Sequence, residues 1–397
     1  MPGLDAIVLL TTGLLAAVVV GHVTQRLARS PIAGYVLAGL VVGSYTPGFE
    51  ADRHVAEQLA GVGVIVLMFG IGLRVRIEEV LAVGHVVIPG AILQGLVVTG
   101  VTAFVAVQAG WGLSAGLLYG VALSVASTAV LVDVLSGHGR LHTPAGRLAV
   151  GWVVVADLCA VVALVLMPAF FADARGHTMA AVGVALAKLG ALAGLTIVAG
   201  ERVLAWVLAQ IARTGSAELL TLAVVALALG IAVSAAQLLG VSMALGAFLA
   251  GLVVGRSAAG VRAAADAVPM RDAFALLFFV SLGMLFDPGT LLDDPQMLAA
   301  TLAIVLVGKP LAAVATVVLF RHPRTVAVPV AVGLAQIGEF SFIVVAVASD
   351  YDVLAADATN TLLAAAIASI VLTPVLFRGL GWIDGARVAA GRARGGG

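Results

Sequence analysis

The sequence predicts an all-α polytopic membrane protein with thirteen transmembrane helices that form two inverted repeats. Three observations lead to this prediction. The 397 residues are 62% hydrophobic and 11% charged, with a mean hydropathy of +1.17, whereas a soluble domain has about 25% charged residues. Apolar runs of about twenty residues, each long enough to cross a bilayer, recur along the chain. A segment of the first half also recurs in the second half.

The composition excludes several other classes of protein. One cysteine cannot form a disulfide framework or a cysteine metal cluster, and a net charge of zero gives no sign of nucleic-acid binding. The first apolar stretch is too long for a cleavable signal peptide. We therefore expect one membrane domain over residues 1–383 and a short basic cytoplasmic tail over 384–397, with no cofactor and no enzymatic activity.

The apolar runs give the expected helices in chain order. They lie at about 4–25, 31–48, 55–73, 84–109, 113–136, 145–170, 178–200, 217–236, 241–255, 272–287, 296–320, 326–349 and 358–380. The basic residues test this assignment, because short cytoplasmic loops collect Lys and Arg. With the N-terminus outside and the C-terminus inside, the external loops contain only Arg53 and Arg175 of the 21 basic residues. Lys188 and Lys309 lie within spans, and the others are cytoplasmic.

An internal repeat indicates a transporter. The segment 34–43 recurs as 246–255 with eight of ten residues identical, at an offset of 212. An odd number of predicted spans separates the start of one copy from the start of the other, so the two copies cross the membrane in opposite directions. Inverted repeats around a site at the midplane are typical of secondary transporters, because they provide two alternating states from one fold.

Two charged residues near the centres of predicted spans are the strongest site candidates. A charge at bilayer depth is costly, and such residues are functional candidates by default. Asp157 has no acidic neighbour in its own span, so its carboxylate can hold a proton or, alternatively, bind a dehydrated cation. Competition between these two ligands is the minimum chemistry of an antiporter. Lys309 is either an ion-pair partner of Asp157 or a static support for unwound helix ends.

Two further spans contain polar interruptions at positions that correspond in the repeats. Glu339 follows Gln336 and Gly338, and the offset of 212 relates Glu339 to Ser127. Paired discontinuous helices indicate a transporter binding site. We expect Glu339 and Gln336 to support the broken helix, with Glu339 offsetting the positive helix ends. Ser124, Ser127 and Thr128 offer oxygen atoms to the cation, and Asp133 is a candidate for a funnel through which ions enter.

At these residues the chain resembles the monovalent cation:proton antiporter-2 family, of the Kef type. The similar segments are 31–40, 67–73, 122–129, 240–251, 278–287 and 333–342. The resemblance implies the fold of NapA/NhaA-like antiporters, in which two discontinuous helices cross in a transport core. It also implies a homodimer, an elevator-like movement of the core, and roles for Asp157 as the transport carboxylate and Lys309 as its basic partner.

The resemblance further implies subdomains within the membrane domain. The dimerisation subdomain is expected at about 1–75 and 217–287, a linker helix at about 178–213, and the transport core at about 84–170 and 295–380. Kef-type proteins commonly continue into a soluble nucleotide-binding regulatory domain, which we do not expect within these 397 residues. A separate cytoplasmic regulatory subunit and a truncation of the chain are the two explanations that stay open. The resemblance places the protein in a bacterial cytoplasmic membrane.

The functional hypothesis is exchange of a monovalent cation for protons. Family members usually have an acidic or amide residue before the aspartate, but here it is Ala156. The missing second carboxylate favours K⁺ over Na⁺ and one proton per cation, without settling either. The alternatives are a gated cation channel and an organic anion symporter driven by protons or sodium. The only metal ion expected at Asp157 is the transported monovalent cation.

Overall fold

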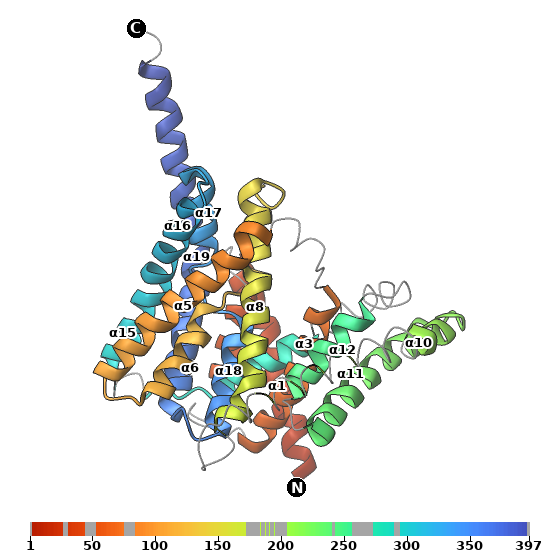
Figure 1. The fold of residues 1–397 in the computed structure, drawn as a ribbon. Helices are drawn as coiled ribbons and strands as arrows, with labels where there is room; N and C mark the ends of the chain where they lie inside the picture. Colours follow the sequence, from red (N-terminus) through yellow and green to blue (C-terminus); the bar gives the residue numbers. More distant parts are fainter. Residues whose placement is uncertain are drawn as a thin grey trace. The chain divides into compact units, whose positions relative to one another are not determined.

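The regular secondary structure of the computed structural model is helical throughout the described residues. The structure describes residues 2–26, 31–43, 53–74, 84–171, 205–239, 243–255, 273–289 and 294–394, with four single positions between 183 and 194. These residues contain no strand (Figure 1). Seven of the described helices are long and apolar enough to cross a membrane. The predicted all-α, multi-pass class is therefore confirmed, whereas the predicted span 178–200, with Lys188, lies almost entirely outside the described residues.

The chain divides into two compact units. The first comprises residues 1–76 and 161–287, and the second comprises residues 77–160 and 288–397. The helices of the first unit are α1 (Pro2–Arg26), α2 (Pro31–Val41), α3 (Arg53–Arg74), α10 (Ala205–Ala212), α11 (Ala217–Leu239) and α12 (Met243–Val254), with an apolar helix at Ala273–Met284. Within this unit α2 packs on α1, and α12 packs on both α3 and α11.

Glycines allow two helix pairs of the first unit to approach closely. A Cβ on Gly39 of α2 would overlap the carbonyl oxygen of Val280, and a Cβ on Gly251 of α12 would overlap the carbonyl oxygen of Phe69. Small residues permit this close backbone contact between membrane helices. The helix Ala273–Met284 therefore lies directly on α2, and α3 lies directly on α12.

These two contacts are related by the internal repeat. Gly39 and Gly251 differ by the repeat offset of 212, and α2 and α12 occupy corresponding places in the two repeats. Each of these helices packs on a helix of the other repeat, since α2 contacts the segment 273–284 and α12 contacts α3. The repeat that the sequence indicated is thus visible in the way the first unit is built.

The second unit contains the interrupted helices. Its helices are α5 (Gly84–Gln108), α6 (Leu113–Ser124), α7 (Thr128–Gly137), α8 (Pro144–Phe171, of which residues up to Ala160 belong here), α15 (Pro295–Ala303), α16 (Lys309–Leu319), α17 (Arg324–Gly333), α18 (Glu339–Asp350) and α19 (Ala356–Arg394). Figure 1 shows α5 beside α6 and α16 beside α17. Trp152 and Tyr119 are fully buried in this unit.

Two predicted spans are each split into two helices, and a third contains a local distortion. The span 113–136 consists of α6 and α7, and the span 326–349 consists of α17 and α18. The interruptions predicted from the polar residues are therefore confirmed. In the span 296–320, a π-helical turn (η2) at Ile304–Gly308 separates α15 from α16. The sequence analysis did not predict this turn.

The close contact at Gly39 is open to test by substitution. Gly39→Ala is expected to destabilise the protein by about 1–3 kcal/mol, because the added methyl group meets a backbone carbonyl that cannot turn away. The matched control is Gly61→Ala in the same unit, where a Cβ has nothing within 4 Å. Thermal unfolding in detergent measures both variants, and equal unfolding temperatures would contradict the inferred contact.

Candidate functional site

The first interruption lies between α6 and α7. The segment Val125–Ser127 is extended, and the Ser127 Oγ accepts a hydrogen bond of 3.3 Å from the Val130 backbone N–H. Ser127 is therefore the N-cap of α7, a role in which serine is strongly preferred. The first helix ends and the second begins inside a predicted span, so we expect their terminal backbone groups at bilayer depth.

The second interruption crosses the first at a glycine. Gly338 is the extended N-cap residue of α18, and a Cβ placed on it would lie 2.6 Å from the carbonyl carbon of Ala126. Only a residue without a side chain fits there. Because Ala126 and Gly338 differ by the repeat offset of 212, the two interruptions meet at equivalent positions. The crossing expected from the family resemblance is present in the second unit.

Lys309 joins the C-terminal ends of both first half-helices. Its side chain is fully buried, and Nζ donates to the carbonyl oxygens of Val125 (2.6 Å) and Gln336 (2.8 Å). Val125 and Gln336 follow the ends of α6 and α17, where backbone carbonyls are left without helical donors. A cation is favourable at such an end. The described residues show no direct ion pair between Lys309 and Asp157.

The π-helical turn sets the position of this lysine. The backbone N–H of Lys309 bonds to the carbonyl of Ile304, five residues earlier. Pro310 follows immediately and has no N–H with which to continue a regular helix. Turns of this kind are frequent at functional sites, because they rotate the side chains that follow them.

Two buried carboxylates lie at the N-terminal ends of the second half-helices. Asp157 of α8 accepts a hydrogen bond of 3.1 Å on Oδ2 from Thr128 Oγ1, and Thr128 is the first residue of α7. Glu339 is the first residue of α18. Asp157 is 4% exposed and Glu339 is 7% exposed. Asp157 interacts electrostatically with both Glu339 and Lys309. Acidic groups are favourable at helix N-termini because of the partial positive charge there.

Hydroxyl groups of neighbouring helices complete the crossing. The contacts are Ser341 Oγ to the Ala122 carbonyl (2.6 Å), the Ile337 N–H to Ser369 Oγ (3.3 Å) and Thr373 Oγ1 to the Ala335 carbonyl (3.3 Å). Ser369 and Thr373 of α19 were not among the site residues predicted from the sequence. The repeat offset was the available signal, since it relates Asp157 to Ser369.

Gln336 connects the two interruptions through its side chain. Its Nε2 donates to the carbonyl oxygens of Ser127 (3.2 Å) and Gly333 (3.1 Å), and the residue is fully buried. The structure thus brings together Asp157, Thr128, Ser127, Lys309 and Gln336, with Glu339 at the same crossing.

Two candidates from the sequence do not join this group through any described contact. Asp133 is an exposed residue of α7, and Ser124 donates to the Val121 carbonyl of its own helix. Among the described residues, no group of three or more His, Cys, Asp or Glu side chains is arranged to hold a metal ion. The crossing offers the carboxylates of Asp157 and Glu339 together with hydroxyl and carbonyl oxygens instead.

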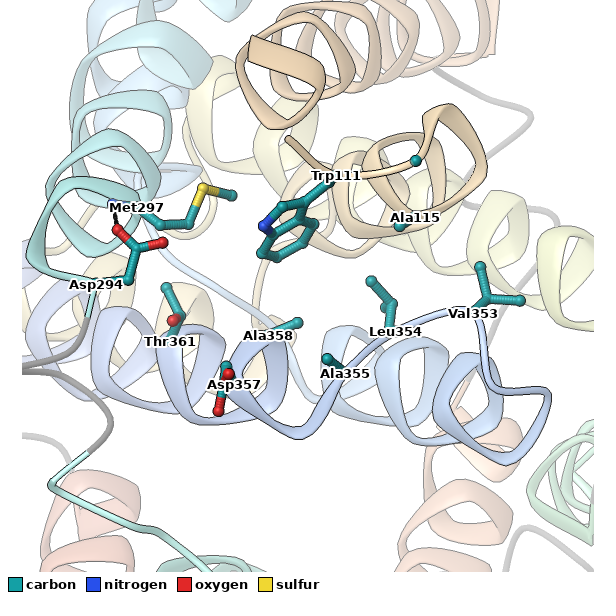
Figure 2. A pocket seen from close by; sticks show the side chains of 11 residues that line it. Trp111, Ala115, Asp294, Met297, Val353, Leu354, Ala355, Asp357, Ala358 and Thr361 are labelled. Atoms are coloured by element: carbon teal, nitrogen blue, oxygen red, sulfur yellow. Dashed lines mark hydrogen bonds between the residues drawn. The ribbon is translucent and has the colours of Figure 1, made fainter. Parts of the chain in front are cut away.

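A separate cavity of about 290 Å³ lies at one end of the second unit (Figure 2). It is lined by Trp111, Gly112, Ala115, Asp294, Met297, Val353, Leu354, Ala355, Asp357, Ala358 and Thr361. Asp294 is used structurally, because its Oδ1 accepts the Met297 N–H (3.0 Å) as the N-cap of α15. None of the residues of the crossing lines this cavity.

Known proteins match the chain along most of its length. Residues 13–378 match the family described as "Sodium/hydrogen exchanger, transmembrane". The putative cation/proton antiporter YbaL of Escherichia coli K12 is 45% identical over 371 residues, covering 92% of this chain and 66% of that protein. The chloroplastic K(+) efflux antiporter 2 of Arabidopsis thaliana is 32% identical over 382 residues, covering 92% of this chain and 32% of that protein. The chain thus spans about two thirds and one third of these relatives.

A solved structure has the same fold. The sodium proton antiporter MjNhaP1 from Methanocaldococcus jannaschii at pH 8 aligns with a TM-score of 0.67 over 95% of this chain and 96% of its own, at 19% sequence identity. At this level of identity the likeness concerns the arrangement of the helices.

Substitution of Lys309 tests its role at the half-helix ends. Lys309→Met leaves two buried carbonyl oxygens without this donor, and each is expected to cost about 1–3 kcal/mol of stability. The control is Thr316→Val on the same helix, because Thr316 Oγ1 donates only to the Ala312 carbonyl of its own helix. A lower unfolding temperature in detergent for Lys309→Met alone is the expected result. Equal effects of the two changes would remove Lys309 from this role.

Proposed function

Because the chain belongs to the sodium/hydrogen exchanger transmembrane family, we propose that it is a secondary active antiporter that exchanges one monovalent cation for one proton. The observation that carries this proposal is the set of charges at the crossing. Asp157 and Glu339 lie at half-helix N-terminal ends, and Lys309 lies at the two C-terminal ends.

The charge balance supports one monovalent ligand at a time. Two carboxylates and one ammonium leave one net negative charge when all three groups are ionised. The half-helix ends contribute two partial positive and two partial negative charges, which offset one another. One proton or one monovalent cation therefore neutralises the site, and a neutral core crosses the membrane at a far lower cost than a charged one.

In the proposed cycle, Asp157 carries the exchange. A cation that reaches the crossing displaces the proton from the carboxyl group, with oxygen atoms of Ser127 and Thr128 beside it. Lys309 and Glu339 keep their charges, since they stabilise helix ends that must not come apart during the cycle. Only the occupant of Asp157 changes, so the exchange moves no net charge.

K⁺ is the proposed cation. Several relatives have names that specify potassium, among them the Arabidopsis K(+) efflux antiporter described above. The neighbour of Asp157 is the buried residue Ala156 rather than a second carboxylate. A single carboxylate with neutral oxygens attracts a cation less strongly than two carboxylates do. It therefore compensates less of the energy needed to remove water from the cation, which favours the larger, more weakly hydrated ion.

The division into two units supports an elevator-like mechanism. We assign the second unit to the moving transport core and the first to a dimerisation subdomain, with α10 in the linker. The proposed topology has thirteen transmembrane helices in a homodimer, with the N-terminus outside and the C-terminus inside. The compact first unit, held by backbone contacts at Gly39 and Gly251, provides the rigid frame that such a movement requires.

Neutralising the transport carboxylate tests the proposal directly. Asp157→Asn is expected to abolish cation-driven proton movement in proteoliposomes, measured as dequenching of a pH-sensitive dye inside the vesicles. The variant should fold, because asparagine keeps an oxygen that accepts from Thr128. Asp133→Asn, an exposed residue outside the crossing, is the control and should retain exchange. Exchange by Asp157→Asn would exclude this residue from the mechanism.

The stoichiometry gives an independent measurement. If one cation replaces one proton, the initial rate of exchange should be independent of an imposed membrane potential, and a supported-membrane recording should show no transport current. A current that grows with the cation gradient would mean that a second charge, such as a proton on Lys309, also moves. Flux without any proton movement would instead indicate a channel.

A further inference from the structure

The orientation of the Gln336 amide is set by its partners. The nitrogen Nε2 faces two backbone carbonyl oxygens, those of Ser127 and Gly333. Only the NH₂ group of an amide can donate to a carbonyl, so the opposite orientation would place three acceptors together. The positions of nitrogen and oxygen in this side chain therefore follow from its surroundings.

This orientation determines which atom of the Gln336 amide is left unpaired. The Gln336 Oε1 is buried and has no hydrogen-bond partner among the described residues. Elsewhere at the crossing, side chains supply donors to the backbone carbonyls, as Lys309, Ser341 and Thr373 do. A buried acceptor without a donor is costly, and it is best explained by a ligand that comes and goes.

The amide group of Gln336 is linked to Asp157 through two neighbouring residues. The Ser127 carbonyl that holds the Gln336 amide is part of the peptide unit leading into Thr128, and Thr128 Oγ1 contacts Asp157. The side chain of Gln336 thus lies one peptide unit from the residue that binds Asp157. Amide carbonyl oxygens are common ligands of hard cations, whereas the site contains no further carboxylate on α8.

We propose that Gln336 Oε1 is a ligand of the transported cation and contributes to the choice between monovalent cations. This inference rests on the proposed antiport function and extends it. A neutral oxygen stabilises a bound cation but adds little to a proton held covalently on Asp157. Gln336 therefore raises the affinity for the cation selectively, without a matching change in the affinity for the proton.

Gln94 provides a matched control within the same unit. It is also a buried glutamine that joins two helices, since its Oε1 accepts from Trp152 Nε1 at 3.0 Å. In Gln94 it is the nitrogen Nε2 that has no partner among the described residues. An NH₂ group cannot bind a cation. Gln94 therefore has a structural role comparable to that of Gln336 but no unpaired oxygen that could be a ligand.

The experiment compares Gln336→Leu with Gln94→Leu in proteoliposomes. The readouts are the initial rate of proton movement at varied K⁺, Rb⁺ and Na⁺ concentrations and the dependence of the rate on proton concentration. We expect Gln336→Leu to raise the KM for K⁺ about tenfold and to change the ratio between the three cations. The half-saturating proton concentration, extrapolated to zero concentration of the competing cation, should be unchanged. Gln94→Leu should leave KM within about twofold.

A second readout does not depend on transport. A bound cation stabilises the folded protein, so K⁺ should raise the unfolding temperature of the wild type in detergent, at lower concentrations than it does for Gln336→Leu. This measurement tests the ligand even if the wild type moves no protons, in which case the proposed function fails by itself. Gln336→Asn, which keeps the amide but shortens the side chain, replaces Gln336→Leu if the latter does not fold.

Three results would overturn the proposal. Equal KM values and equal cation-dependent stabilisation in Gln336→Leu and wild type would overturn it, and so would a lower unfolding temperature or maximal rate as the only effect. Parallel changes in KM for both glutamine variants would also overturn it, because they would attribute the effect to helix contacts rather than to the oxygen.

Discussion

The second unit is built around a single constraint, which is that broken helices leave backbone polar groups without their regular helical partners in the interior of the protein. Each of the two interruptions leaves carbonyls at one helix end and N–H groups at another, and an unsatisfied group in a bilayer costs several kcal/mol. Lys309 satisfies one carbonyl from each interruption, and hydroxyls of α18 and α19 satisfy others. Because these donors come from different helices, the interruptions hold the whole unit together.

The same arrangement separates support from exchange. The ammonium of Lys309 is engaged with backbone oxygens, whereas the carboxylate of Asp157 has one hydroxyl contact, to Thr128. A group that is held by two short hydrogen bonds resists a change of partner, and a group with spare acceptor capacity accepts one. A buried charged group therefore need not exchange a proton or an ion during transport. In the proposed cycle the supporting charges are constant, and one variable position responds to the ion gradients.

Sequence patterns predicted the elements of the site better than their contacts. Gly338 and the polar residues around it identified the interruption, and the repeat offset paired it with Ser127. Support of unwound helix ends was one of the two roles considered for Lys309, but the particular carbonyls that it contacts could not be predicted in this way, because backbone carbonyls are present at every residue and become free acceptors only when a helix ends. Ser369 and Thr373 look like ordinary small polar residues of an apolar helix. Asp133 of α7 is exposed, which is compatible with the predicted entry funnel, and that role stays a prediction.

The exchange of helices between repeats in the first unit has a consequence for biosynthesis. The glycine surface of α2 contacts Val280, a residue made about 240 positions later, which takes roughly 12–50 s at typical rates of translation. During that interval α2 has left the ribosome without the helix it packs against. Its exposed backbone must be covered by lipid, by the insertion machinery or by α1, its neighbour in the same repeat. Assembly of the first unit is therefore completed late, and the two repeats cannot mature one after the other.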